Sequence, residues 1–104
     1  MSGPNADHIP LRPGRVLLDQ FLRPRGLSQS KFARRIGISY PRLNQVIHGK
    51  RGLTADTAVR LARVLGTSPE YWLELEQRWR VWAVLHSPQA EKIEHLEPLD
   101  DIAA

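Results

Sequence analysis

Apolar residues recur along the chain at the three- and four-residue spacing of amphipathic helices, and no segment shows the strict alternation of a strand. A Ser or Thr stands as an N-cap before most of these segments, and a Gly or Pro follows them. The pattern predicts five helices, over residues 14–22, 28–37, 39–49, 54–66 and 68–85. The expected fold class is therefore all-α.

Two of these helices are short and are separated by a very tight turn. Ser28 is a good N-cap for the first of them, and Gly37 can take the left-handed conformation that ends it. Ser39 caps the second, and Pro41 lies in its first turn, where a missing N–H does no harm. The apolar residues of this second helix predict its inner face: Leu43, Val46 and Ile47. Its outward residues are mostly polar: Tyr40, Arg42, Asn44, Gln45 and His48.

Charge is distributed unevenly along the 104 residues. The chain has a formal net charge of +4 and a pI of about 10.1, but residues 91–104 hold one Lys and five acids, a net −4, which leaves +8 on residues 1–90. A basic globular part favours a polyanionic partner. The composition, 41% hydrophobic and 25% charged, is that of a soluble globular protein, and no apolar run is long enough to span a membrane. The absence of cysteine and of a signal-peptide pattern in residues 1–10 favours the cytoplasm.

Two short helices joined by a tight glycine-containing turn are typical of proteins that lay the second helix in the DNA major groove. Arg pairs with guanine there, Asn and Gln pair with adenine, and apolar groups pack on the thymine methyl. The predicted base-reading residues are Ser39, Tyr40, Pro41, Arg42, Asn44 and Gln45.

Phosphate contacts are expected from residues that flank this helix. Gln29 and Lys31 open the preceding helix, and His48, Lys50 and Arg51 follow the base-reading helix. Each of these residues alone is an ordinary solvated position. Their clustering with the base-reading candidates is what indicates a DNA-binding surface.

The sequence predicts no catalytic residues, no metal site and no cofactor. The four His residues are scattered, none lies in a metal-binding motif, and the absence of Cys excludes thiolate zinc sites. The GKRG segment at residues 49–52 lacks the GxxxxGK[ST] pattern of a phosphate-binding loop. We therefore expect the chain not to be an enzyme.

Two adjoining segments resemble the HigA/VapI branch of the Cro/cI-type (XRE) helix-turn-helix family. They are RPGRVLLDQFLRPRG at residues 12–26 and LSQSKFARRIGISYPRLNQVIHGKRGLTADTAVRLARVLGTSPEYWLELE at residues 27–76. Those segments cover roughly 65 of the 104 residues, and the combination of GKRG, TADTA and LGTSPE is quite specific to that branch. The chain departs from the family at Arg15, where an acidic residue is common, and beyond Trp82, where it matches no known pattern.

The resemblance implies a compact five-helix, lambda-repressor-like DNA-binding domain with N- and C-terminal extensions. It also implies a homodimeric autorepressor that binds a palindromic operator, and an antitoxin that neutralises a RelE-type toxin, which cuts messenger RNA. Two alternatives remain: a stand-alone transcriptional regulator of the same family, and a protein-interaction module that has lost DNA binding.

The fifth predicted helix carries more apolar surface than one small core needs. Trp72, near its start, is predicted to close the core. Trp79, Trp82 and Leu85 lie further along, and large aromatics beyond a compact core favour an interface with a second subunit or with the toxin. The sequence leaves those two partners open.

Three regions follow from the composition. We expect a flexible leader over residues 1–11, the helix-turn-helix domain over 12–86 and an acidic tail over 87–104. With only scattered apolar residues, the segment 91–104 is expected to lack stable structure until it binds something. It is expected to shield the basic domain from non-specific DNA, to contact a basic toxin, or to be a solvated end without a function.

Overall fold

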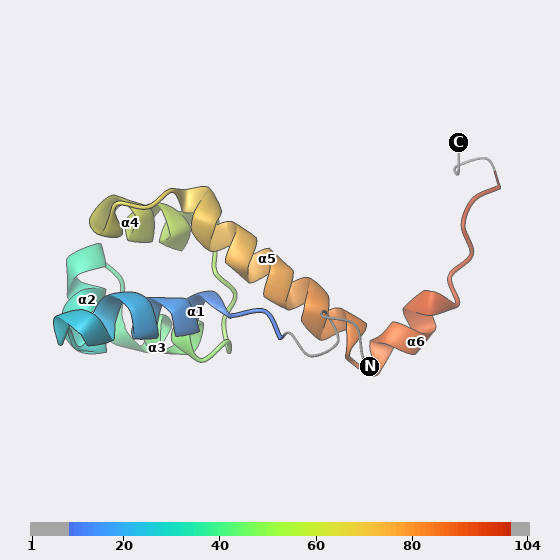
Figure 1. Cartoon of the computed structure of the whole chain (residues 1–104), viewed down its shortest axis with the longest axis horizontal. Coiled ribbons are helices and arrows are strands. Elements are labelled where there is room, and N and C mark those ends of the chain that lie inside the picture. The colour runs from blue at the N-terminus through green and yellow to red at the C-terminus, as the bar shows by residue number, and fades with distance from the viewer. Residues whose placement is uncertain (1–8, 101–104) are drawn as a thin grey trace.

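The computed structural model describes residues 9–100, and that part of the chain is helical, without strands. Its elements are α1 (Pro13–Val16), η2 (Leu17–Leu22), η3 (Arg23–Arg25), α2 (Gln29–Ile36), α3 (Tyr40–Ile47), α4 (Ala55–Leu65), α5 (Pro69–Leu85) and α6 (Gln89–Glu94) (Figure 1). The all-α prediction and all five predicted helices are confirmed. The predicted N-caps of α2 to α5 each accept a backbone N–H from three residues further on: Ser28, Ser39, Thr54 and Ser68.

The first predicted helix is not a regular α-helix. It begins as α1, continues as the π-helical segment η2 and tightens into the 3₁₀ turn η3, which ends at Gly26 in the left-handed conformation. Gly14 lies against α3 so closely that a Cβ there would stand 2.6 Å from the Ile47 carbonyl carbon. Glycine at this position therefore lets α1 and α3 touch through their backbones.

The core lies among η2, α2, α3, α4 and the first turns of α5. Trp72 is completely buried, as predicted, and packs on Phe21 with 5.4 Å between ring centroids. Its indole Nε1 donates to Thr67 Oγ1 at 2.6 Å, so the polar atom of this side chain is also satisfied. Other fully buried side chains come from each of the surrounding helices: Leu17, Leu22, Phe32, Leu43 and Leu61.

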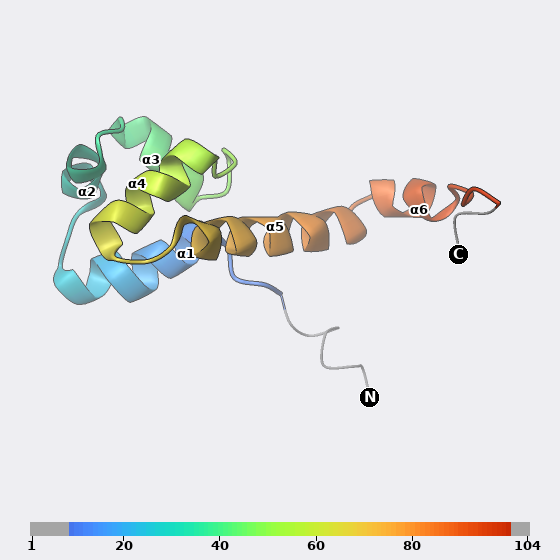
Figure 2. The ribbon, with the colours of Figure 1, turned by 90° about the horizontal axis from the view of Figure 1, so that it is seen from above.

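Helix α5 extends well beyond the core. Its first part packs against α4 and α1, and its last part projects from the globular body toward α6, so the described chain measures 52 × 33 × 23 Å (Figures 1 and 2). Val81 and Leu85 on the projecting part are 58% and 60% exposed. We call residues 81–94, which comprise the end of α5 and all of α6, the arm.

The start of the acidic tail differs from its prediction, because α6 overlaps the first residues, 91–94, of the segment that was expected to lack structure. Ser87 initiates it: its hydroxyl donates to the Val84 carbonyl at 2.7 Å and accepts from the Gln89 N–H at 3.2 Å. Most of the predicted leader and the end of the tail, residues 1–8 and 101–104, lie outside the described residues. Within residues 9–100, no helix is both long and apolar enough to cross a membrane.

Candidate nucleic-acid interface

Helices α2 and α3 pack on each other across a sharp turn. Gly37 ends α2 in the left-handed conformation, with φ of 76°, and the Ile38 N–H then donates back to the Ala33 carbonyl at 3.0 Å. Ser39 starts α3 immediately afterwards. This geometry is a helix-turn-helix, in which α3 occupies the position of the helix that enters the major groove.

The inner face of α3 is buried in the core, which leaves its opposite face for a partner. At about 100° per residue, Pro41, Gln45 and His48 lie opposite the buried Leu43 and Val46. Asn44 lies on the flank that faces α2, and Arg42 on the flank that faces α4. Ser39 and the half-exposed Tyr40 stand at the N-terminal end of the helix.

Two predicted base-reading residues are hydrogen-bonded to predicted phosphate-binding residues. The Asn44 amide nitrogen donates to Gln29 Oε1 at 3.0 Å, and Gln45 Oε1 accepts from Arg51 Nε at 2.9 Å. Neither bond uses the Gln29 amide nitrogen or the terminal guanidinium nitrogens of Arg51. In each pair the hydrogen bond therefore holds the side-chain amide of the α3 residue in place, and Gln29 or Arg51 keeps N–H donors that can bind a phosphate.

The loop after α3 brings further cations to one end of the helix. Backbone N–H groups of Lys50 and Arg51 both donate to the Gln45 carbonyl, at 2.8 and 3.2 Å, and both side chains are exposed. His48 is also exposed, and its Nδ1 lies 2.9 Å from the Asn44 carbonyl oxygen. Lys31 is exposed at the opposite end of the surface, in the first turn of α2.

Arg12 was not predicted as part of this surface. A Cβ at Gly49 would stand 2.5 Å from Arg12 Nη1, so this guanidinium lies directly against the loop after α3. The same guanidinium lies over the Trp79 ring, 5.8 Å from its centroid. A local sequence pattern cannot predict this contact, because Arg12 and Gly49 are far apart in the sequence.

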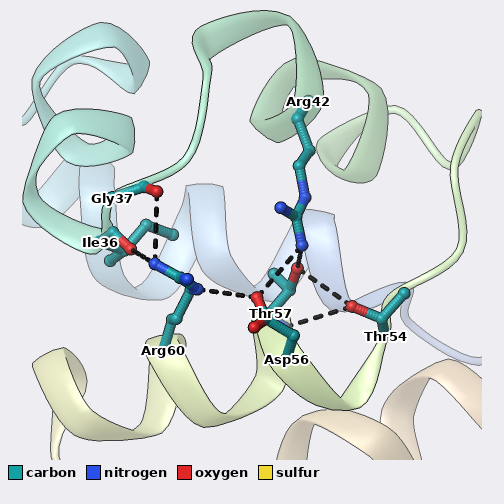
Figure 3. Close-up of polar contacts among 7 residues, drawn as sticks. All are labelled: Ile36, Gly37, Arg42, Thr54, Asp56, Thr57 and Arg60. Atoms are coloured by element: carbon teal, nitrogen blue, oxygen red, sulfur yellow. Dashed lines mark hydrogen bonds and ion pairs between the residues drawn. The ribbon is translucent and has the colours of Figure 1, made fainter.

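Arg42 is placed differently from the other base-reading candidates, because its guanidinium points toward α4 (Figure 3). Its Nη2 donates to Thr57 Oγ1 at 2.8 Å and lies 3.3 Å from Asp56 Oδ1. The same Asp56 oxygen accepts from Arg60 Nε at 2.7 Å. The structure thus places Pro41 and Gln45 on the open face of α3, Asn44 on its flank toward α2, and Ser39 and Tyr40 at its N-terminal end. It does not bring the Arg42 guanidinium to them.

Asp56, which contacts both Arg42 and Arg60, belongs to a network that joins α2, α3 and α4. Arg60 Nη1 donates to the Ile36 and Gly37 carbonyls at the end of α2, at 2.9 and 3.3 Å, so one side chain links α4 to the turn (Figure 3). The hydrogen bond from Arg60, and to a smaller extent the contact with Arg42, lowers the pKa of Asp56 below its usual value. No residue of α4 was among the predicted DNA-binding residues.

The three predicted interface residues on α5 have different surroundings. Two guanidinium groups lie over the Trp79 ring, with Arg12 at 5.8 Å and Arg80 at 5.4 Å from the ring centroid. Trp82 stacks on His86 at 4.3 Å, and Leu85 is exposed. Trp79 is therefore tied to the body, whereas Trp82 and Leu85 lie on the arm.

Comparison with known proteins supports the helix-turn-helix geometry. The family model described as helix-turn-helix matches residues 18–72. Antitoxin HigA-1 of Vibrio cholerae is 31% identical over 90 residues, 86% of this chain and 84% of the relative. Virulence-associated protein I of Dichelobacter nodosus is 38% identical over 66 residues, 64% of this chain and only 61% of that relative's length.

Among solved structures, Pseudomonas aeruginosa antitoxin HigA with the higBA promoter superposes with a TM-score of 0.79 at 34% identity, covering 86% of this chain and 98% of that one. The chain therefore belongs to the helix-turn-helix (XRE) family. Within it, the chain falls in the branch of the HigA and VapI proteins. This is a family of DNA-binding regulators and antitoxins and not of enzymes.

Proposed function

We propose that the protein is the antitoxin and autorepressor of a toxin-antitoxin module: a homodimer that binds a palindromic operator in its own promoter and neutralises a RelE-like, mRNA-cleaving toxin. The observation that carries the DNA-binding half is the pairing of Asn44 with Gln29 on the α2 flank of α3 and of Gln45 with Arg51 on its open face. A surface that couples base-reading amides to phosphate-binding donors is suited to the major groove.

Base reading in this proposal comes from the exposed face of α3. Asn44 and Gln45 supply the amide groups that pair with adenine, and Tyr40 and Pro41 supply apolar surface for a thymine methyl. Ser39 supplies a hydroxyl at the start of the helix. Arg42 belonged to the predicted base-reading set, but it can reach a base only by leaving its partners on α4.

Phosphate contacts in this proposal come from both ends of the surface, from Gln29, Lys31, His48, Lys50 and Arg51. Arg12, beside the loop after α3, adds another cation to the same edge. Because each phosphate contact releases counterions, binding should weaken steeply as salt is raised.

Dimerisation is assigned to the arm. Val81, Trp82 and Leu85 form apolar surface on a helix that projects from the body, where a second copy can cover it. A two-fold dimer would present two α3 helices about 34 Å apart, one turn of DNA, which matches a palindromic operator. Trp79 contributes to this interface only at its edge, because the Arg12 and Arg80 guanidinium groups lie over its ring.

The first experiment is a salt-titrated binding assay on the promoter DNA upstream of the gene, with a scrambled duplex of equal length beside it. Specific binding should fall by about 5-fold to 150-fold in Gln45→Ala, since one bidentate base contact is worth about 1–3 kcal/mol. The matched control is Gln20→Ala, an exposed glutamine on η2, which should bind like the unmodified protein. Equal binding to both duplexes would contradict the autorepressor.

The toxin half is supported by the similarity to HigA antitoxins and is tested separately. A small basic protein encoded beside this gene should arrest growth when expressed alone, and co-expression of the antitoxin should relieve the arrest. Gln45→Ala should still relieve it, because DNA reading is not needed for neutralisation. Specific operator binding without such a neighbour would instead support the stand-alone regulator.

A further inference from the structure

Arg42 is the one cationic side chain within α3, and its guanidinium is turned away from the open face. Guanine is the base that Arg recognises, through two hydrogen bonds to O6 and N7. With Arg42 held on α4, the remaining base-reading residues on α3 and at its N-terminal end offer hydroxyl, aromatic, apolar and amide groups: Ser39, Tyr40, Pro41, Asn44 and Gln45. The amide and apolar groups among them suit adenine and thymine, because Asn and Gln pair with adenine and apolar surface packs on the thymine methyl.

Asp56 is the charged acceptor of the two α4 residues that hold this orientation. Its Oδ1 lies 3.3 Å from Arg42 Nη2 and 2.7 Å from Arg60 Nε, so one carboxylate oxygen holds guanidinium groups from two helices (Figure 3). Arg60 is itself held by the carbonyls that end α2, which prevents Asp56 from following Arg42 away. Thr57 Oγ1, at 2.8 Å, is the second acceptor for the Arg42 guanidinium.

Building on the proposed function, in which α3 reads the operator, we propose that Asp56 is a specificity-determining residue. It holds the Arg42 guanidinium on α4, so that α3 reads A·T pairs and guanine is not read by Arg42. Asp56 acts as a positioning residue and contacts no base.

The test is selection of binding sequences from a randomised duplex library by the full-length protein. Asp56→Asn keeps the shape of the side chain and removes its charge. The matched control is Asp19→Asn, which also breaks two arginine ion pairs, at 2.7 Å to Arg15 and 2.6 Å to Arg23, and changes net charge equally. Those pairs lie within the first helical segment, so Asp19→Asn should select the same sequences as the unmodified protein.

Asp56→Asn should select a new guanine at one position in each half-site, with a preference of about 5-fold to 150-fold over the other bases. Arg42→Ala alone should leave the selected sequence unchanged. Adding Arg42→Ala to Asp56→Asn should abolish the new guanine, which separates a released arginine from a general effect of removing a negative charge near DNA.

Thr57→Val provides a second way to release Arg42, because it removes the other acceptor while keeping Asp56 and the volume of this buried side chain. It should shift selection toward the same guanine, and thermal unfolding of each variant verifies that it is folded. An unchanged selection in both Asp56→Asn and Thr57→Val would overturn the proposal. So would a changed selection in Arg42→Ala alone, which would mean that Arg42 already reads a base. If the unmodified protein selects no sequence at all, the proposed function fails as well.

Discussion

Replacing Gly14 by Ala tests the contact that positions α1 against α3. A Cβ at residue 14 would stand 2.6 Å from the Ile47 carbonyl carbon and closer still to its Cα and carbonyl oxygen. Ordinary contacts of a Cβ begin at 3.4 Å, so the two helices must separate. All three obstructing atoms are backbone, so no side-chain rotation can relieve the clash.

Two physical effects of this substitution oppose each other. Ala is a better helix former than Gly by up to about 1 kcal/mol, which alone would stabilise α1. Separating α1 from α3 disturbs a core that includes Val16, Leu17 and Ile47, and overpacking of this kind typically costs about 1–3 kcal/mol, occasionally more. Because the clash involves the backbone of both helices, the steric effect should win, with a net loss of about 1–3 kcal/mol.

Urea unfolding followed by circular dichroism measures this change. Gly52→Ala is the control, since a Cβ there would touch only the ends of two flexible side chains, Glu76 at 3.4 Å and Arg80 at 3.8 Å. Its stability should stay within about 0.5 kcal/mol of the unmodified protein. Operator affinity of Gly14→Ala should also fall, because Ile47 ends the helix that reads DNA. A variant as stable as the unmodified protein, or more stable, would refute the backbone contact.

Four further predictions test other parts of the molecule. Lys50→Ala should weaken binding to every duplex and reduce the slope of log affinity against log salt by about one, whereas Lys92→Ala on α6 should leave that slope unchanged. Trp82→Ala should shift the protein toward a monomer in light scattering, and an unchanged mass would remove Trp82 from the proposed dimer interface. Because the pKa of Asp56 is lowered in the folded protein, its ion pairs stabilise the fold at pH values above the usual carboxyl pKa, and this stability is lost as the pH falls through the lowered pKa. The stability of Asp56→Asn should therefore depend less on pH in the acidic range than that of the unmodified protein. Parallel plots of unfolding free energy against pH for the two proteins would contradict this. Deleting residues 91–104 should strengthen non-specific DNA binding if the tail shields the basic domain, or weaken toxin binding if it contacts the toxin; unchanged affinities for both would rule out both roles.

Much of the fold follows from local features of the sequence. Each helix from α2 to α5 carries its own apolar residues, a Ser or Thr cap and a terminating residue, and these act over a few residues at a time. The tight turn at Gly37 and the polar residues of α3 are equally local, so the helix-turn-helix and the group of residues on its open face could be predicted without coordinates.

Only the tertiary structure decided where the long polar side chains point. Arg42 lies at the edge of α3, from which its flexible side chain has the reach to extend either toward DNA or toward α4, and helical periodicity does not distinguish these directions. Its partners Asp56 and Thr57 are 14 and 15 residues away, and the pairing of Gln29 with Asn44 also spans 15 residues. Such contacts exist only once the helices have packed, because packing brings distant side chains within hydrogen-bonding distance and so determines which of them remain available to a ligand.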